Sequence, residues 1–224
     1  MKNFIAVCIC VFTLVACGTD ETPKNTREAV QDSPKGPAAS LTEPQVFAYI
    51  LGEQFGLPSY LNMPSRIGAM LDLDAIVQGI VDNESVLKDS TRELQVSPEA
   101  QKELEAYYAK QVEERQKAGE NAKPVALAGP IKGGNVIITD TTSAIIKYSY
   151  MQGVLIDRLF EGMRRNFNED FDYHFFVKGV RESVFSMMDS TFQKSVSDSL
   201  LQAVSIHYKN RMKQIREERR NAVQ

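Results

Sequence analysis

Few residues in this sequence could carry catalysis or bind a metal, and they are scattered along the chain. His174 and His207 are its only histidines, and neither belongs to an HExxH or similar metal-binding pattern. Ser85 and Lys88 match the SxxK pattern of acyl-serine enzymes, but the accompanying SDN and KTG elements do not occur in the sequence. The sequence also contains no GxSxG motif and no P-loop. We therefore predict that the chain is not an enzyme and uses no metal or cofactor.

The composition is that of an ordinary folded protein. The chain has 224 residues, of which 43% are hydrophobic and 25% are charged, and its formal net charge is −3. These proportions argue against wholesale disorder. A nucleic-acid partner would need a concentrated basic face, for which this charge balance gives no indication, so we predict no nucleic-acid binding.

The N-terminal residues predict secretion and lipidation. An apolar run from Phe4 to Ala16 follows Lys2, and it is shorter than the roughly 20 residues that span a bilayer. The run ends in Leu14-Val15-Ala16-Cys17, which resembles the lipobox of bacterial lipoproteins. We interpret residues 1–16 as a signal peptide and Cys17 as the residue that receives the lipid. The alternative is a plain signal peptide followed by a chance cysteine.

A polar stretch separates this signal from the rest of the chain. Residues 17–41 are rich in Thr, Asp, Glu, Pro, Ser and Gly and show no periodic apolar pattern, which is typical of a flexible tether. The lipid on Cys17 would attach the protein to the membrane of a bacterial cell envelope. By the rule known for enteric bacteria, Gly18 after the cysteine favours the outer membrane.

The remaining sequence contains an internal repeat. Shifting the chain by one hundred positions places Asp72 on Asp172, and many apolar positions nearby also coincide. Further upstream the shift becomes 101 and places Tyr49 on Tyr150. The alternative is that any two amphipathic helical stretches can be slid into partial agreement.

Each copy of the repeat predicts three helices, so we expect an all-α fold. Copy one covers residues 42–118, a linker covers 119–141, and copy two covers 142–222. In copy two we expect helices at about 142–166, 172–189 and 197–221.

In copy one, helix-capping signals mark where each helix begins. Thr42, Asp72 and Ser97 are each suited to start a helix, and we expect Gly56-Leu57-Pro58 to end the first one. The only short strand candidate in the sequence is Val136–Thr139.

Four glycines inside the predicted helices recur between the copies, namely Gly52, Gly79, Gly153 and Gly179. A glycine in a helix interior costs about 1 kcal/mol relative to alanine. Their recurrence suggests that the missing side chains let two helix backbones cross closely. The alternative is that they are tolerated surface glycines.

The repeated pattern resembles the N-terminal domain of macrophage infectivity potentiator-type FKBP peptidyl-prolyl isomerases. The pattern is Tyr-x-x-Gly on one helix, then an apolar residue and Asp, and seven positions later Gly, an apolar residue and an acid. The residues that carry the resemblance are Tyr49, Gly52, Leu71-Asp72, Gly79-Ile80 and Asp82, with their partners Tyr150, Gly153, Phe171-Asp172, Gly179-Val180 and Glu182.

In that family the domain is helical, dimerises by interlocking its first two helices and holds substrate in a chaperone-like way. The isomerase domain would follow the long third helix, but here a second helical copy takes its place. The resemblance therefore implies two copies that interlock within one chain as a pseudo-dimer, without isomerase activity. This arrangement predicts a monomer in solution.

These observations lead to a functional hypothesis. We expect a membrane-anchored, non-catalytic interaction module with a holdase role in envelope protein folding, whose partners are unfolded or other proteins. The alternative is an accessory subunit of a full-length FKBP-type isomerase. An unrecognised helical enzyme is a third reading, and it would require a polar cleft with perturbed titratable groups. The methionines and phenylalanines of copy two either form an exposed capture surface or belong to the core of the helical bundle.

Overall fold

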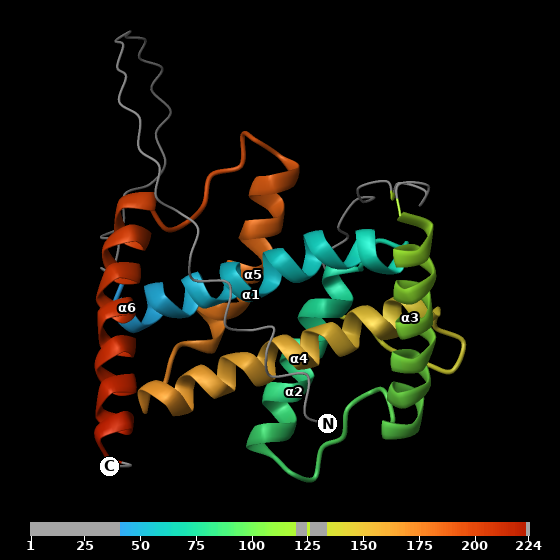
Figure 1. Ribbon diagram of the computed structural model, residues 1–224, viewed down its shortest axis with the longest axis horizontal. Coiled ribbons are helices and arrows are strands. Elements are labelled where there is room, and N and C mark those ends of the chain that lie inside the picture. Colours follow the sequence, from blue (N-terminus) through green and yellow to red (C-terminus); the bar gives the residue numbers. More distant parts are fainter. Residues whose placement is uncertain (1–40, 120–124, 126–133, 223–224) are drawn as a thin grey trace, which may run out of the picture. The chain divides into compact units, whose positions relative to one another are not determined.

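The computed structural model describes residues 41–119, 125 and 134–222. The predicted signal peptide, the lipidation residue Cys17 and all but the last residue of the predicted tether lie outside the described residues. Within the described part, every regular element is an α-helix, which confirms the prediction of an all-α fold (Figure 1). None of these helices has a stretch long and apolar enough to cross a membrane.

Six helices make up the described part of the chain. They are α1 (Glu43–Ile67), α2 (Leu73–Lys88), α3 (Pro98–Ala118), α4 (Ala144–Phe167), α5 (Tyr173–Met188) and α6 (Asp198–Asn221). The strand candidate at residues 136–139 is neither strand nor helix.

Local side-chain caps account for where the second helix of each copy begins. The Asp72 carboxylate accepts a hydrogen bond from the backbone N–H of Ala75 at 2.8 Å, and α2 starts at the next residue. Asp172 caps α5 in the same way, accepting from the N–H groups of His174 and Phe175. A carboxylate at this position satisfies backbone donors that the first helical turn leaves free.

Helix α1 continues through the residues that were expected to end it. The prediction that Gly56-Leu57-Pro58 stops the first helix is wrong, because α1 extends to Ile67 with Pro58 and Pro64 inside it. A proline removes one backbone donor and costs about 3 kcal/mol in a helix interior. The second half of α1 nevertheless buries Tyr60 and Ile67, which are 2% and 3% exposed. Tertiary packing of this half therefore overrides the local preference for a break.

The continuation of α1 also locates the change of repeat offset. Gly52 and Gly153 are 101 positions apart, whereas the left-handed C-cap residues Gly68 and Asn168 are 100 apart. Accordingly α1 has 25 residues and α4 has 24, with the extra residue between the glycine and the C-cap. Pro58 lies in this interval. Pro64 lies there too, and each proline removes one donor from the hydrogen-bond ladder of α1.

The main helix contacts join the two copies rather than the helices within one copy. Helix α1 packs across α5 and α4 packs across α2, so that each copy supplies one helix to each crossing (Figure 1). The apolar faces of both copies thereby enter one shared core. The copies are interlocked within the chain.

The long third helices are anchored at the starts of the other copy's first helices. Tyr208 of α6 stacks on Phe47 near the start of α1, with ring centroids 3.8 Å apart. Tyr108 of α3 lies against Tyr148 near the start of α4, with centroids 4.1 Å apart. Both contacts cross from one copy to the other, and they occupy equivalent positions.

The same third helices also hold the far ends of their own first helices. Arg115 of α3 donates to the backbone carbonyl of Ser65 in α1 at 2.8 Å, and Arg211 of α6 donates to that of Phe167 in α4 at 3.1 Å. Helices α1 and α4 therefore run in opposite directions between α3 and α6 (Figure 1).

Candidate functional site

The first helix crossing brings two of the four predicted glycines together. At the α1–α5 crossing, a Cβ atom added to Gly52 would lie 2.8 Å from the backbone nitrogen of Val180 and still closer to the carbonyl oxygen of Phe176. A Cβ atom added to Gly179 would lie 2.9 Å from the carbonyl carbon of Tyr49. Each glycine thus faces the backbone of the opposite helix, where there is no room for a side chain.

The second crossing repeats this geometry with the other two glycines. At the α2–α4 crossing, a Cβ atom on Gly79 would lie 2.9 Å from the carbonyl carbon of Tyr150. One on Gly153 would lie 2.8 Å from the carbonyl carbon of Ile76. All four glycines are buried and none is a surface glycine, so these residues permit the close approach of the crossing helices.

Two buried tyrosines connect the copies by hydrogen bonds to acidic residues. The Tyr49 hydroxyl donates to the Glu182 carboxylate at 2.8 Å, and the Tyr150 hydroxyl donates to Asp82 at 2.9 Å. Both tyrosines are fully buried. Burial raises the pKa of both phenols well above its ordinary value, and the hydrogen bonds to the acids raise it further. The phenols therefore stay protonated and remain donors at physiological pH.

The sequence repeat included these tyrosines and acids but could not show that they pair. The tyrosine of each copy binds the acid of the other copy, so the partners are separated by 133 and 68 positions. Only the interlocked arrangement brings them within hydrogen-bond distance.

We predict that replacing Tyr150 with Phe lowers the free energy of unfolding by about 1–3 kcal/mol. The change removes the donor to Asp82 and also the acceptor for the backbone N–H of Gln95, which lies 3.0 Å from the Tyr150 oxygen. Urea denaturation measures the effect, and Tyr107→Phe is the control because the Tyr107 side chain is 53% exposed. Equal stability of the two variants would contradict the prediction.

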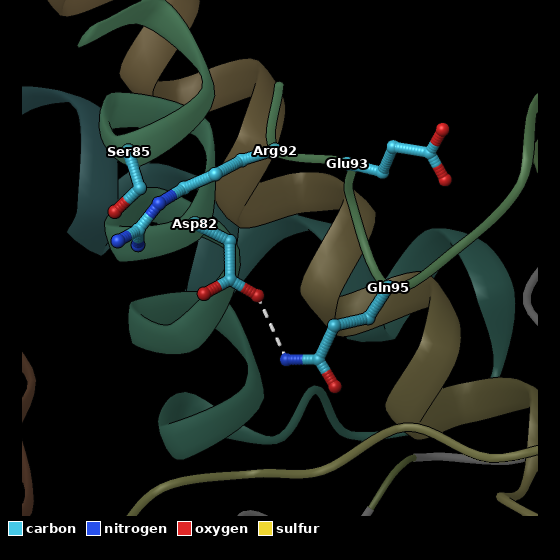
Figure 2. Close-up of a pocket in the computed structure, with 5 residues that line it drawn as sticks. All are labelled: Asp82, Ser85, Arg92, Glu93 and Gln95. Atoms are coloured by element: carbon cyan, nitrogen blue, oxygen red, sulfur yellow. Dashed lines mark hydrogen bonds between the residues drawn. The ribbon is translucent and has the colours of Figure 1, made fainter. Parts of the chain in front are cut away.

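A polar pocket of about 380 Å³ lies beside one of these acids and is lined by Asp82, Ser85, Arg92, Glu93 and Gln95 (Figure 2). The Arg92 side chain reaches back toward Ser85, whereas Glu93 points away (Figure 2). The Asp82 carboxylate is held by the Gln95 amide at 2.7 Å in addition to its tyrosine partner. Because its oxygens already accept hydrogen bonds from the protein, Asp82 is poorly placed to act as a free catalytic base.

The equivalent place in copy two is apolar. Phe185 and Phe192 occupy the positions of Ser85 and Arg92, and their ring centroids are 5.6 Å apart. The copies therefore share a backbone arrangement, but the end of the second helix is polar in copy one and apolar in copy two.

The α2–α4 crossing also contains a buried charged cluster that the sequence analysis missed. The Asp157 side chain is fully buried and accepts a hydrogen bond from the Asn83 amide at 2.7 Å. Nearby, Glu84 is 4% exposed and pairs with Arg164 at 3.0 Å. Burial, together with the charges of Glu84 and Glu161, raises the pKa of Asp157 to about 6 against the opposing effects of Asn83 and Arg164. The only sequence signal was the acidic residue itself: Asp157 lies three positions from both Val154 and Phe160, and therefore on the apolar face of the helix.

The residues that could have suggested catalysis do not come together. His174 is exposed on α5, and the His207 ring on α6 lies 3.3 Å from the Glu43 carboxylate. In the SxxK match, Ser85 donates to the carbonyl of Val81 and Lys88 pairs with Glu84, so neither is bonded to the other. No group of His, Cys, Asp and Glu within residues 41–119 and 134–222 could hold a metal ion.

The methionines and phenylalanines of copy two divide between core and surface. Phe176 is fully buried and stacks on Phe160 with ring centroids 3.9 Å apart. Met187 and Met188, at the end of α5, are 36% and 43% exposed. Part of this set therefore belongs to the core and part is exposed, and a capturing role for the exposed part stays a prediction.

The geometry defines an all-α protein with two similar three-helix copies that pack against each other within one chain. Its crossings are set by glycines, and its copies are joined by tyrosine–acid hydrogen bonds. Comparison with known proteins adds no relative, because no protein family, curated protein or solved structure matches the chain.

Proposed function

We propose that this protein is a non-catalytic helical lipoprotein of the bacterial cell envelope that acts as an interaction module and holds unfolded client proteins. The sequence supports the anchor through Cys17 and its lipobox-like surroundings. The holding role is supported by apolar side chains that remain accessible after the copies have interlocked.

The apolar end of α5 is the observation on which the holding role rests. We use this name for Phe185, Met187, Met188 and Phe192. Two of them are more than a third exposed, and the other two are half-buried against each other. Exposed methionines and aromatic residues suit binding to varied apolar sequences, because methionine adapts its shape to different partners. The same positions in copy one hold Ser85, Leu87, Lys88 and Arg92, which form a more polar end.

We expect Met187→Gln combined with Met188→Gln to weaken client holding about fivefold, because two partly exposed apolar side chains are lost from the binding surface. Light scattering of a denatured, aggregating client at stoichiometric ratios measures this effect. Leu87→Gln is the matched control. Leu87 is 53% exposed at the position equivalent to Met187, but it belongs to the more polar end in copy one. Failure of the unmodified protein to suppress aggregation would refute the holding role.

The alternative role, as an accessory subunit of an FKBP-type isomerase, would use the same helix faces. Those faces at α1–α5 and α2–α4 are occupied by the chain's own second copy. We therefore expect light scattering to give the mass of a monomer for the protein without its lipid. A stable dimer, or a full-length isomerase co-purifying from envelope extracts, would favour the alternative role instead.

A further inference from the structure

Part of the linker between the copies is bound to copy one through its main chain. The backbone N–H of Val136 donates to the Gln78 side-chain oxygen at 3.3 Å. The Gln95 side chain donates to the carbonyl of Val136 at 3.1 Å and accepts from the N–H of Ile138 at 2.7 Å. The Gln95 side-chain amide therefore donates to one backbone carbonyl and accepts from one backbone N–H of the segment, as a residue of a neighbouring β-strand would do.

The bound segment has the alternation of an extended strand. Val136 and Ile138 are half-buried and pack against the core, whereas Ile137 between them is 78% exposed. Successive side chains of an extended backbone point to opposite sides. The site formed by Gln78, Gln95 and the apolar surface beneath this segment, here called the glutamine clamp, therefore accepts two apolar side chains spaced two residues apart.

The clamp is held in position by the polar network between the copies. The Gln95 side-chain amide donates to the Asp82 carboxylate at 2.7 Å, and the backbone N–H of Gln95 donates to the Tyr150 hydroxyl at 3.0 Å. Neither bond involves the linker, so both can orient the amide for another chain and thereby lower the entropic cost of binding.

The clamp is not a requirement of the fold, because copy two is built without it. Lys178 and Ser195 stand at the positions of the two glutamines. Ser195 uses both its backbone N–H and its hydroxyl to donate to Glu182, at 2.8 and 2.9 Å, so it offers no amide to a passing chain. Copy one alone therefore has this arrangement.

We propose that the glutamine clamp is a binding site for extended polypeptide, and that residues 135–139 are its internal ligand. A client segment with apolar side chains at alternate positions displaces the linker and takes over its main-chain hydrogen bonds. The recognised feature is backbone geometry with two small apolar contacts, so many sequences fit. This inference deepens the proposed holding function and rests on it for the nature of the client.

The test measures binding of a fluorescent peptide with the sequence of residues 134–140, capped at both ends. Val136→Ser combined with Ile138→Ser weakens the internal ligand, and we expect at least about tenfold tighter peptide binding than in the unmodified protein. Ile137→Ser is the matched control, because this neighbour faces solvent and its loss leaves the clamp filled.

A third substitution removes the clamp's own hydrogen bonds. Adding Gln95→Met to the double variant removes both amide bonds to the bound chain, and we expect the peptide to bind about tenfold more weakly than to the double variant. Gln193→Met, at an exposed position in copy two, is the control for the Gln95 substitution.

Hydrogen exchange provides one further measurement. Hydrogen exchange of the unmodified protein needs no substitution, and excess peptide should speed exchange at the amides of Val136 and Ile138. No gain in binding by the double variant, or binding that Gln95→Met leaves unchanged, would overturn the proposal. A dimer that forms by exchanging residues 134–140 would also overturn it, because the occupant would then be a second copy. Peptide binding without suppression of client aggregation would refute the holding function but not the clamp, and the reverse result would refute the clamp alone.

Discussion

Replacing Gly153 with Ala should lower the free energy of unfolding by about 3 kcal/mol. In most helix interiors the same change is stabilising by about 1 kcal/mol, because alanine has the higher helix propensity. Here the new methyl group would overlap the backbone of Ile76 on the crossing helix, whose carbonyl carbon would lie only 2.8 Å away. Backbone cannot move aside as a flexible side chain can, so the two helices must separate and lose packing along the crossing. Urea denaturation monitored by circular dichroism measures the change.

The same helix offers a matched control. Gly162 also lies inside α4, but an added Cβ atom there would have no neighbour within 4 Å. Gly162→Ala should therefore be stabilising by about 0.5–1 kcal/mol, opposite in sign to Gly153→Ala. A stabilising effect of Gly153→Ala as well would show that the crossing tolerates a side chain.

A double substitution tests whether the two glycines of one crossing act together. Gly79 and Gly153 face each other's helices at the α2–α4 crossing. Once one alanine has pushed the helices apart, the second meets less obstruction. Gly79→Ala combined with Gly153→Ala should therefore cost clearly less than the sum of the two single changes. Additive costs would indicate that each glycine is constrained separately.

Replacing Asp157 with Asn should raise the free energy of unfolding at pH 7 by about 2–3 kcal/mol. The folded-state pKa of Asp157 is raised from its ordinary value of 3.8 to about 6 by burial and by the charge of Glu84. Ionised Asp157 is therefore a cost to the folded protein at neutral pH, and each unit of pKa shift corresponds to about 1.4 kcal/mol. Asparagine keeps the shape and can still accept from the Asn83 amide, but it carries no charge.

The sign of the pH dependence follows from the direction of this shift. Between about pH 4 and pH 6, the folded protein binds more protons at Asp157 than the unfolded chain does. The stability that this group contributes is therefore present at low pH and is lost as the pH rises through 6. The groups around it are Asn83 and Glu84 on α2, Glu161 and Arg164 on α4, and Tyr173 at the start of α5.

Urea denaturation at several pH values tests this expectation. The stability difference between Asp157→Asn and the unmodified protein should grow from pH 4 to pH 7. Asp140→Asn is the control, since Asp140 is exposed in the turn before α4. A difference that does not vary with pH would mean that Asp157 is not the titrating group.

Much of the local structure could be predicted from the sequence because its causes lie within a few residues. Caps at Asp72 and Ser97 define where α2 and α3 begin, and the apolar spacing predicts helices. The recurring glycines could also be singled out, since glycine is costly in a helix unless something requires it. The residues of the two tyrosine–acid pairs were visible as repeated positions, although their pairing was not.

The sequence by itself determined the helices, their caps and the positions that recur between the copies. The family resemblance implied that the first two helices of the copies interlock, but only the tertiary structure decided that α1 crosses α5 and α2 crosses α4, because that pairing depends on apolar faces far apart in the chain. The same long-range packing carries α1 past Pro58, buries the charge of Asp157 and aligns Gln95 with the linker. None of these outcomes follows from the conformational preference of the residues concerned. The interactions that stabilise them are made with residues that only the folded chain brings together, and no short stretch of sequence contains those residues.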